Sequence, residues 1–83
     1  MNLQAATGYY ANFFDEKGLD IFVILNESNP IPTTDDFIFI ENTITESISK
    51  YACFDEDKVK QILDSYFPAG VQIVNHSTGY VKL

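Results

Sequence analysis

One cysteine and one histidine are the side chains of this chain best suited to nucleophilic chemistry. Cys53 and His76 would form a thiolate and base pair only if the fold brought them together. Cys53 lies between an alanine and a phenylalanine, which is typical of a small core residue, and His76 lies in a polar turn. A single thiol and a single imidazole are also too few ligands for a structural zinc ion. We therefore expect Cys53 to be structural and His76 to be dispensable.

Adjacent carboxylates occur at three places, and paired carboxylates act as acids, bases or metal ligands in some enzymes. The runs are Asp15-Glu16, Asp35-Asp36 and Asp55-Glu56-Asp57. Neighbouring residues point to opposite faces of a strand and diverge by about 100° on a helix, so no run forms a site alone. The third run also lacks the glycine and the distal glutamate of an EF-hand loop. Because common nucleotide, acyl-transfer and zinc-hydrolase motifs are absent as well, we predict no enzyme, no catalytic residue, no metal site and no cofactor.

The charge balance favours a protein partner over a nucleic acid or a membrane. Acidic residues number 12 and basic residues 5, all of them lysine, which gives a formal charge of -7. A negative field repels polyanions, and without arginine the chain lacks the planar side chain that best grips phosphate. We therefore expect no direct binding of nucleic acid and no membrane association.

The function that fits these features best is that of a small acidic module that binds another protein without catalysis. In its sharper form the protein is an inhibitor or adaptor that presents carboxylates to a basic groove and mimics nucleic acid, with a size and charge common among phage-encoded anti-defence inhibitors. The candidate partner-binding residues are Asp35, Asp36, Glu56, Asp57, Tyr9 and Tyr10. The alternative is a structural or assembly subunit that forms a homodimer through an apolar sheet face. An acidic surface that only maintains solubility is the simpler interpretation of the same charges.

The length of the chain predicts one domain over residues 1–83, since 83 residues leave no room for a second core. The longest purely apolar run, Ile21–Leu25, is far shorter than the roughly 20 residues that cross a bilayer. The first sixteen residues contain none of the basic residues that begin an export signal. A cytoplasmic location is therefore expected.

Periodicity and turn residues predict an α+β fold with the element order β-β-β-α-α-β-β. Strands are expected at 8–14, 19–25, 37–40, 71–74 and 80–83, helices at 43–52 and 55–67, and a loop at 26–36. The final hairpin is expected to join the first strands in one mainly antiparallel sheet of four to five strands. Two short helices are expected to pack on one face of that sheet.

A stripe of apolar residues in the second helix defines the expected core. The stripe residues are Val59, Ile62, Leu63 and Phe67, and they are predicted to pack on Phe22, Ile24, Phe37 and Phe39. The stretches 21–25 and 37–40 are apolar on both alternating faces, which predicts central strands that are covered on both sides. Because two short helices cover only one side, the other face is either an interface or is covered by the aromatic residues Tyr9, Tyr10, Phe13 and Phe14.

Overall fold

The computed structural model describes residues 9–16, 18–48, 53–78 and 81–82, and these residues form an α+β fold. The elements in chain order are β1 (Tyr9–Phe14), β2 (Asp20–Leu25), α1 (Thr34–Ser47), β3 (Cys53–Phe54), α2 (Glu56–Tyr66), β4 (Val71–Asn75) and β5 (Val81–Lys82). The predicted α+β class is confirmed, whereas the predicted order β-β-β-α-α-β-β is wrong.

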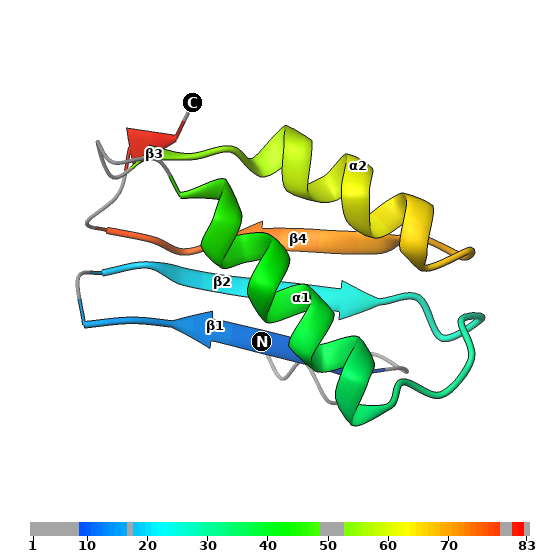
Figure 1. Ribbon diagram of the computed structural model, residues 1–83. Helices are drawn as coiled ribbons and strands as arrows, with labels where there is room; N and C mark the ends of the chain where they lie inside the picture. Colours follow the sequence, from blue (N-terminus) through cyan, green and yellow to red (C-terminus); the bar gives the residue numbers. More distant parts are fainter. Residues whose placement is uncertain (1–8, 17, 49–52, 79–80, 83) are drawn as a thin grey trace.

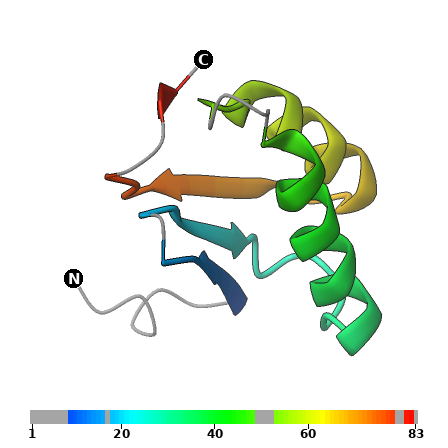
Figure 2. The ribbon, with the colours of Figure 1, turned by 60° about the vertical axis from the view of Figure 1, so that its left-hand side comes forward.

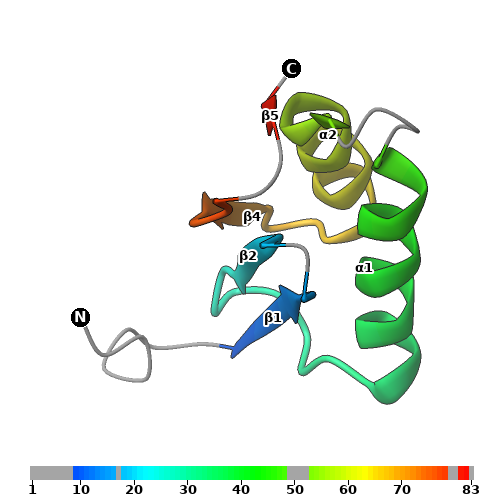
Figure 3. The ribbon, with the colours of Figure 1, turned by 90° about the vertical axis from the view of Figure 1, so that its left-hand side faces the viewer.

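The main sheet has three antiparallel strands in the order β1-β2-β4. Figure 1 shows both helices in front of this sheet, and the turned views in Figures 2 and 3 show them together on one side of it. The predicted β1–β2 hairpin is present. Its turn is held by Asp15, whose carboxylate accepts a 3.0 Å hydrogen bond from the Leu19 N–H, and by Gly18, whose φ of 99° favours glycine.

The predicted third strand at 37–40 is wrong, because these residues lie inside α1. Thr33 caps this helix: its hydroxyl accepts a hydrogen bond from the Asp36 N–H, and the Asp36 carboxylate accepts one from the Thr33 N–H. Ile40 and Ile44, four residues apart, are both buried, so one helical face supplies the core. Alternating aromatic and β-branched residues favour a strand locally, but the cap and the buried face outweigh that preference.

The start of α1 also corrects the neighbouring predictions. The expected loop at 26–36 ends earlier, because the helix begins at Thr34. The described residues of the helix expected from residue 43 are the C-terminal part of α1, which ends at Ser47, and Ile48, its C-cap. Residues 49–52 of that expected helix lie outside the part of the chain that the structure describes.

The predicted second helix is confirmed by α2. Its N-cap is Asp55, whose carboxylate accepts a 3.1 Å hydrogen bond from the Lys58 N–H. The prediction that the last two strands form a hairpin in the main sheet is wrong, because β5 pairs in parallel with β3 in a separate sheet. At the other end of β4, the side chains of Lys60 and Asp64 from α2 bind the backbone groups of Val71.

The core lies between the helices and one face of the sheet. Ile21, Val23 and Leu25 of β2 are buried, whereas Phe22 and Ile24 between them are half-buried on the opposite face. The prediction that α2 packs on Phe22 and Ile24 is therefore wrong, because successive side chains of a strand point to opposite faces.

The helical side of the core is close to the prediction. Val59, Leu63 and Phe67 are buried, but Ile62 is 37% exposed and lies at the margin. Phe37 and Phe39 are half-buried and pack on the core from α1, not from a strand. The predicted contact of α2 with the core therefore included one residue, Ile62, that lies at its edge.

Candidate functional site

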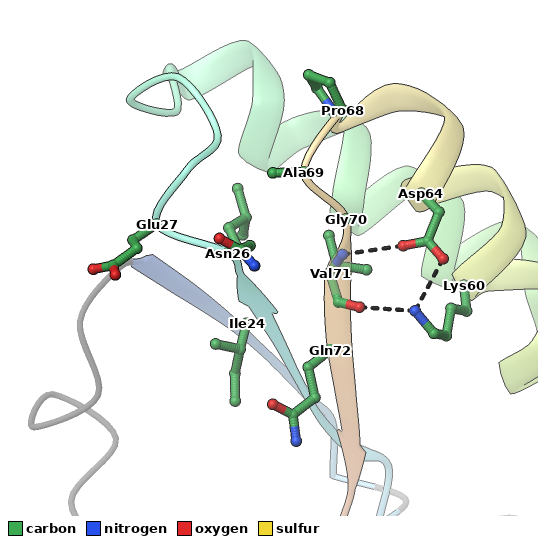
Figure 4. Close-up of a pocket in the computed structure, with 11 residues that line it drawn as sticks. Ile24, Asn26, Glu27, Lys60, Asp64, Pro68, Ala69, Gly70, Val71 and Gln72 are labelled. Carbon is green, nitrogen blue, oxygen red and sulfur yellow. Dashed lines mark hydrogen bonds and ion pairs between the residues drawn. The ribbon is translucent and has the colours of Figure 1, made fainter.

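One hollow of the described surface lies between the end of β2 and the turn that precedes β4, with a volume of about 610 Å³. Figure 4 shows Lys60 and Asp64 of α2 beside Val71 in this hollow. The Lys60 ammonium donates to the Asp64 carboxylate and to the Val71 carbonyl, both at 2.9 Å. The other oxygen of Asp64 accepts a 3.0 Å hydrogen bond from the Val71 N–H. Together the two side chains bind both backbone groups of Val71.

This pair of charged residues serves the fold. The hydrogen bond from Lys60, followed by that from the Val71 N–H, holds the pKa of the Asp64 carboxyl below its ordinary value. Both carboxylate oxygens are engaged, and the two side chains are 49% and 40% exposed, so the attraction between their charges is well screened. The arrangement positions the edge of β4 and engages both oxygens of Asp64.

A buried amide lies beside the same hollow. Asn29 Nδ2 donates to the carbonyl oxygens of Asn26 and Gly70, each at 3.0 Å, and Asn29 Oδ1 accepts a 2.8 Å hydrogen bond from the Ala69 N–H. These bonds join the β2–α1 loop to the α2–β4 turn. The polar groups of this region thus connect two loops of the fold. We call this connection the Asn29 joint.

A second hollow lies on the helix layer and has a volume of about 520 Å³. We call it the helix hollow, and its lining residues are Phe39, Gln61, Ile62, Ser65 and Tyr66. The ring of Tyr66 stacks on that of Phe39, with 4.1 Å between the ring centroids. Ile62 and Tyr66 are 37% and 43% exposed, so this hollow offers apolar surface to solvent.

A hydrogen bond joins the two helices at one end of the helix hollow. The Tyr66 hydroxyl donates to Asp36 Oδ1 at 2.6 Å, and Asp36 Oδ2 accepts from the Thr33 N–H at 2.8 Å. The bond from Tyr66, followed by that from Thr33, lowers the pKa of the Asp36 carboxyl, and the bond to Asp36 raises the pKa of Tyr66. Because both Asp36 oxygens are engaged, Asp35 is the more available carboxylate of this predicted pair.

The four predicted carboxylates are not brought together. The two helices run in opposite directions (Figure 1), so the first turn of α1 lies beside the last turn of α2. Glu56 and Asp57 lie in the first turn of α2, and Glu56 is ten residues, or about 15 Å, from Tyr66 along the helix. Asp57 is exposed and Glu56 is half-buried. The two acidic pairs therefore lie at opposite ends of the helix layer.

Sequence reasoning assigned Phe39 and Ile62 to the core and missed the helix hollow. Within α1, Asp35, Phe39, Asn42 and Glu46 are spaced i, i+4, i+7 and i+11, which puts them on one helical face. An acidic and aromatic stripe of this kind is visible in the sequence only when 34–47 is read as a helix. On α2, the exposed Asp57 precedes the lining residue Gln61 by one turn, as Asp35 precedes Phe39 on α1.

The predicted tyrosines lie on β1, apart from the helix hollow. Tyr9 and Tyr10 are 47% and 38% exposed, and the Tyr10 ring lies 6.0 Å from that of Phe22. His76 is exposed, and its backbone N–H donates to the Asp20 carbonyl at 2.8 Å, which extends the hydrogen-bond ladder between β2 and β4. The predicted core position of the Cys53 side chain lies outside the part of the chain that the structure describes.

Within residues 9–16, 18–48, 53–78 and 81–82, no group of three histidine, cysteine, aspartate or glutamate side chains is arranged to hold a metal ion. None of the helices in these residues combines the length and the apolar character that a membrane crossing requires. Comparisons of the chain with protein-family models, with curated proteins and with solved structures gave no match. The surfaces of the described residues are therefore the basis for assigning a function.

Proposed function

We propose that this protein is a non-enzymatic binding module that holds another protein on its helix layer. The observation that supports the proposal is the helix hollow, where Ile62 and Tyr66 are exposed. Each helix also carries an exposed carboxylate one turn before a lining residue, Asp35 before Phe39 and Asp57 before Gln61. A matching partner carries a large apolar side chain close to lysine or arginine. The apolar side chain fills the space beside Ile62 and Tyr66, and the basic groups face these carboxylates.

The charge of α1 supports a basic partner. This helix contains four carboxylates and no lysine. Asp35 and Glu46 are both exposed and eleven residues apart, which separates them by about 17 Å along the helix axis. Exposed charges of this kind speed association by steering more than they raise affinity. An inhibitor or adaptor that occupies a basic groove, including a groove that takes nucleic acid, is the finer form of this proposal.

The open face of the sheet is a weaker candidate for the binding surface. Three strands spaced about 4.8 Å apart and about six residues long cover roughly 14 Å by 20 Å. That area, roughly 300 Å², is no larger than the apolar patches of ordinary monomers, so the apolar surface of this face does not by itself indicate a partner.

The experiment compares affinity capture from the native host by the wild type and by an Ile62→Lys variant. Ile62 is 37% exposed, so lysine is tolerated there while its charge is incompatible with a buried apolar contact. The affinity of the captured partner is then measured with purified proteins. We expect Ile62→Lys to weaken binding at least about tenfold. A partner that binds this variant as tightly as the wild type would show that the helix hollow is not the binding surface.

A second measurement tests the charges. Asp35→Lys is compared with Glu27→Lys, which makes the same change of charge at an exposed residue of the β2–α1 loop. We expect Asp35→Lys to slow association at least about threefold at low salt, and Glu27→Lys to slow it less. The difference should shrink as the Debye length falls from about 30 Å at 0.01 M salt to about 8 Å at 0.15 M. Equal effects of the two variants would argue against steering by α1.

A further inference from the structure

Two hydrogen bonds at the start of β2 show which backbone groups of β1 face outward. The Asp20 carbonyl accepts from His76, on the β4 side, and the Leu19 carbonyl accepts from Asp15, on the β1 side. Backbone groups alternate in direction along a strand. Even-numbered residues of β2 therefore turn their backbone groups toward β4, and odd-numbered residues turn theirs toward β1.

The outer edge of β1 consequently carries a row of backbone groups. The β1 residues opposite the odd-numbered residues of β2 are Tyr9, Ala11 and Phe13, and these bind β2. The remaining three, Tyr10, Asn12 and Phe14, direct their N–H and C=O groups away from the sheet. β1 is the end strand of the order β1-β2-β4, and no described residue binds this edge.

Edge strands are usually protected by charged residues, proline or a bulge, and β1 has none of these. Its sequence, YYANFF, is uncharged, and its pairing with β2 is continuous over all six residues. Tyr10 and Phe14 are 38% and 67% exposed. In a chain with a formal charge of -7, β1 is therefore an uncharged edge with exposed aromatic rings, which is open to pairing with another strand.

We propose that β1 pairs with β1 of a second copy of this chain, antiparallel, about a two-fold axis between the two Asn12 residues. This register uses all three residues whose backbone groups point outward. Asn12 pairs with Asn12 of the second copy, and Tyr10 pairs with Phe14 of the second copy on both sides of the axis. Each such pair exchanges two backbone hydrogen bonds. The two sheets then form one continuous sheet of six strands.

The side chains of β1 are complementary to themselves in this register. On the open face, Tyr10 lies opposite Phe14 of the second copy, and cross-strand aromatic pairs stabilise sheets. On the helix face, Ala11 lies opposite Phe13 of the second copy, so a small residue meets a large one. A hollow of about 260 Å³ adjoins this position, lined by Ala11, Asn12, Phe13, Phe37, Ile40 and Glu41. It gives the incoming Phe13 ring space beside Phe37 and Ile40 of α1.

Electrostatics distinguish this contact from partner binding at the helix hollow. Two chains of formal charge -7 repel each other, and salt screens that repulsion. Pairing through β1 should therefore strengthen as salt rises, whereas binding of a basic partner should weaken. The proposal of β1 pairing does not depend on partner binding at the helix hollow, so the two proposals can be tested separately.

The experiment measures the molar mass of the full chain by sedimentation velocity as protein concentration rises. We expect the mass to rise from that of one chain to that of two, at lower protein concentration in 0.15 M than in 0.01 M salt. Phe14→Lys places a charge on the paired edge and should weaken the dimer at least about tenfold. The matched control is Ile38→Lys, which makes the same charge change at a 50% exposed residue of α1 and should leave the dimer unchanged.

Hydrogen exchange of the wild-type protein tests the same contact without a variant. Exchange of the N–H groups of Tyr10, Asn12 and Phe14 should slow as protein concentration rises, because only the dimer binds them. A wild type that stays monomeric, a Phe14→Lys protein that dimerises normally, or protection confined to other residues would overturn the proposal. A chain that pairs at β1 only with a peptide of another protein would also overturn the choice of a second copy as occupant.

Discussion

The side chain of Asn29 binds the backbone of Gly70 across 41 residues of sequence, with 3.0 Å between Asn29 Nδ2 and the Gly70 carbonyl oxygen. Asn29 is only 9% exposed, and its amide also binds Asn26 and Ala69. The loop before α1 and the turn before β4 are thereby joined. One side chain therefore holds the loop that leads into α1 against the turn that leads into β4.

Replacing Asn29 with alanine should destabilise the protein. The change leaves the Ala69 N–H without its acceptor in a part-buried setting, so we expect the free energy of unfolding to fall by about 1–3 kcal/mol. Urea denaturation measures the loss. Ser28→Ala, at the exposed neighbouring residue, is the control and should stay within about 0.5 kcal/mol of the wild type. Equal stability of the two variants would mean that the joint contributes nothing.

Gly70 itself should tolerate few substitutions. Its φ of 83° lies in the left-handed region, where a side chain costs about 1–2 kcal/mol, so Gly70→Ala should lower the free energy of unfolding by about that amount. A Cβ atom there would lie 3.4 Å from Asp64 Oδ1, which is an ordinary contact, so the cost comes from the backbone. Gly70→Asn should cost less, because asparagine enters this region more readily. Thermal denaturation that ranks asparagine below alanine would contradict this account.

The two neighbouring apolar residues of α2 should respond differently to truncation. Leu63 is fully buried, so Leu63→Ala should cost about 2–5 kcal/mol. Ile62 is 37% exposed, so Ile62→Ala should lower the free energy of unfolding clearly less. The same change should nevertheless weaken partner binding. Urea denaturation of the two variants checks the difference in stability, and binding measurements check the effect on the partner. Similar stability losses would contradict the burial pattern of α2.

The second helix could be predicted from the sequence because its signals agree. Asp55 is a good cap, and Val59, Leu63 and Phe67 recur at helical spacing before Pro68. For α1 the signals conflict. Residues 37–40 have the aromatic and β-branched composition of a strand, and the cap at Thr33 follows two prolines that suggest a loop. The cap and the burial of one helical face together decide for the helix, and burial depends on residues distant in the chain.

The site was predictable to a smaller extent. Asp35 and Asp36 are both predicted to face a partner, and the structure describes Asp35 as exposed and Asp36 as half-buried. The engagement of Asp36 depends on Tyr66, 30 residues away, and on the antiparallel packing of the helices. Likewise the stack of Phe39 on Tyr66 requires that both residues lie on helices. Contacts of this kind follow from tertiary structure, and local patterns do not contain them.

Acid should destabilise the protein through Asp36 and Asp64. The pKa of each carboxyl is lowered from its ordinary value of 3.8, that of Asp36 chiefly by the Tyr66 hydroxyl and that of Asp64 chiefly by Lys60. A carboxyl with a lower pKa when folded binds fewer protons than in the unfolded chain. Its stabilising effect is therefore present above about pH 4 and is lost as the pH falls through the folded pKa.

A Tyr66→Phe variant isolates the contribution of Asp36. Phenylalanine keeps the ring that stacks on Phe39 but removes the hydroxyl, so the pKa of Asp36 should rise toward its ordinary value. The variant should be less stable than the wild type at pH 6, and the difference should shrink as the pH falls to about 2, because a protonated Asp36 loses its charge-assisted bond. Urea denaturation across this pH range measures the difference.

Tyr9→Phe is the control, because it removes the same atom from a 47% exposed tyrosine of β1. Its stability relative to the wild type should not change as the pH falls. A difference between Tyr66→Phe and the wild type that stays constant with pH would mean that the charge of Asp36 does not stabilise the contact between α1 and α2.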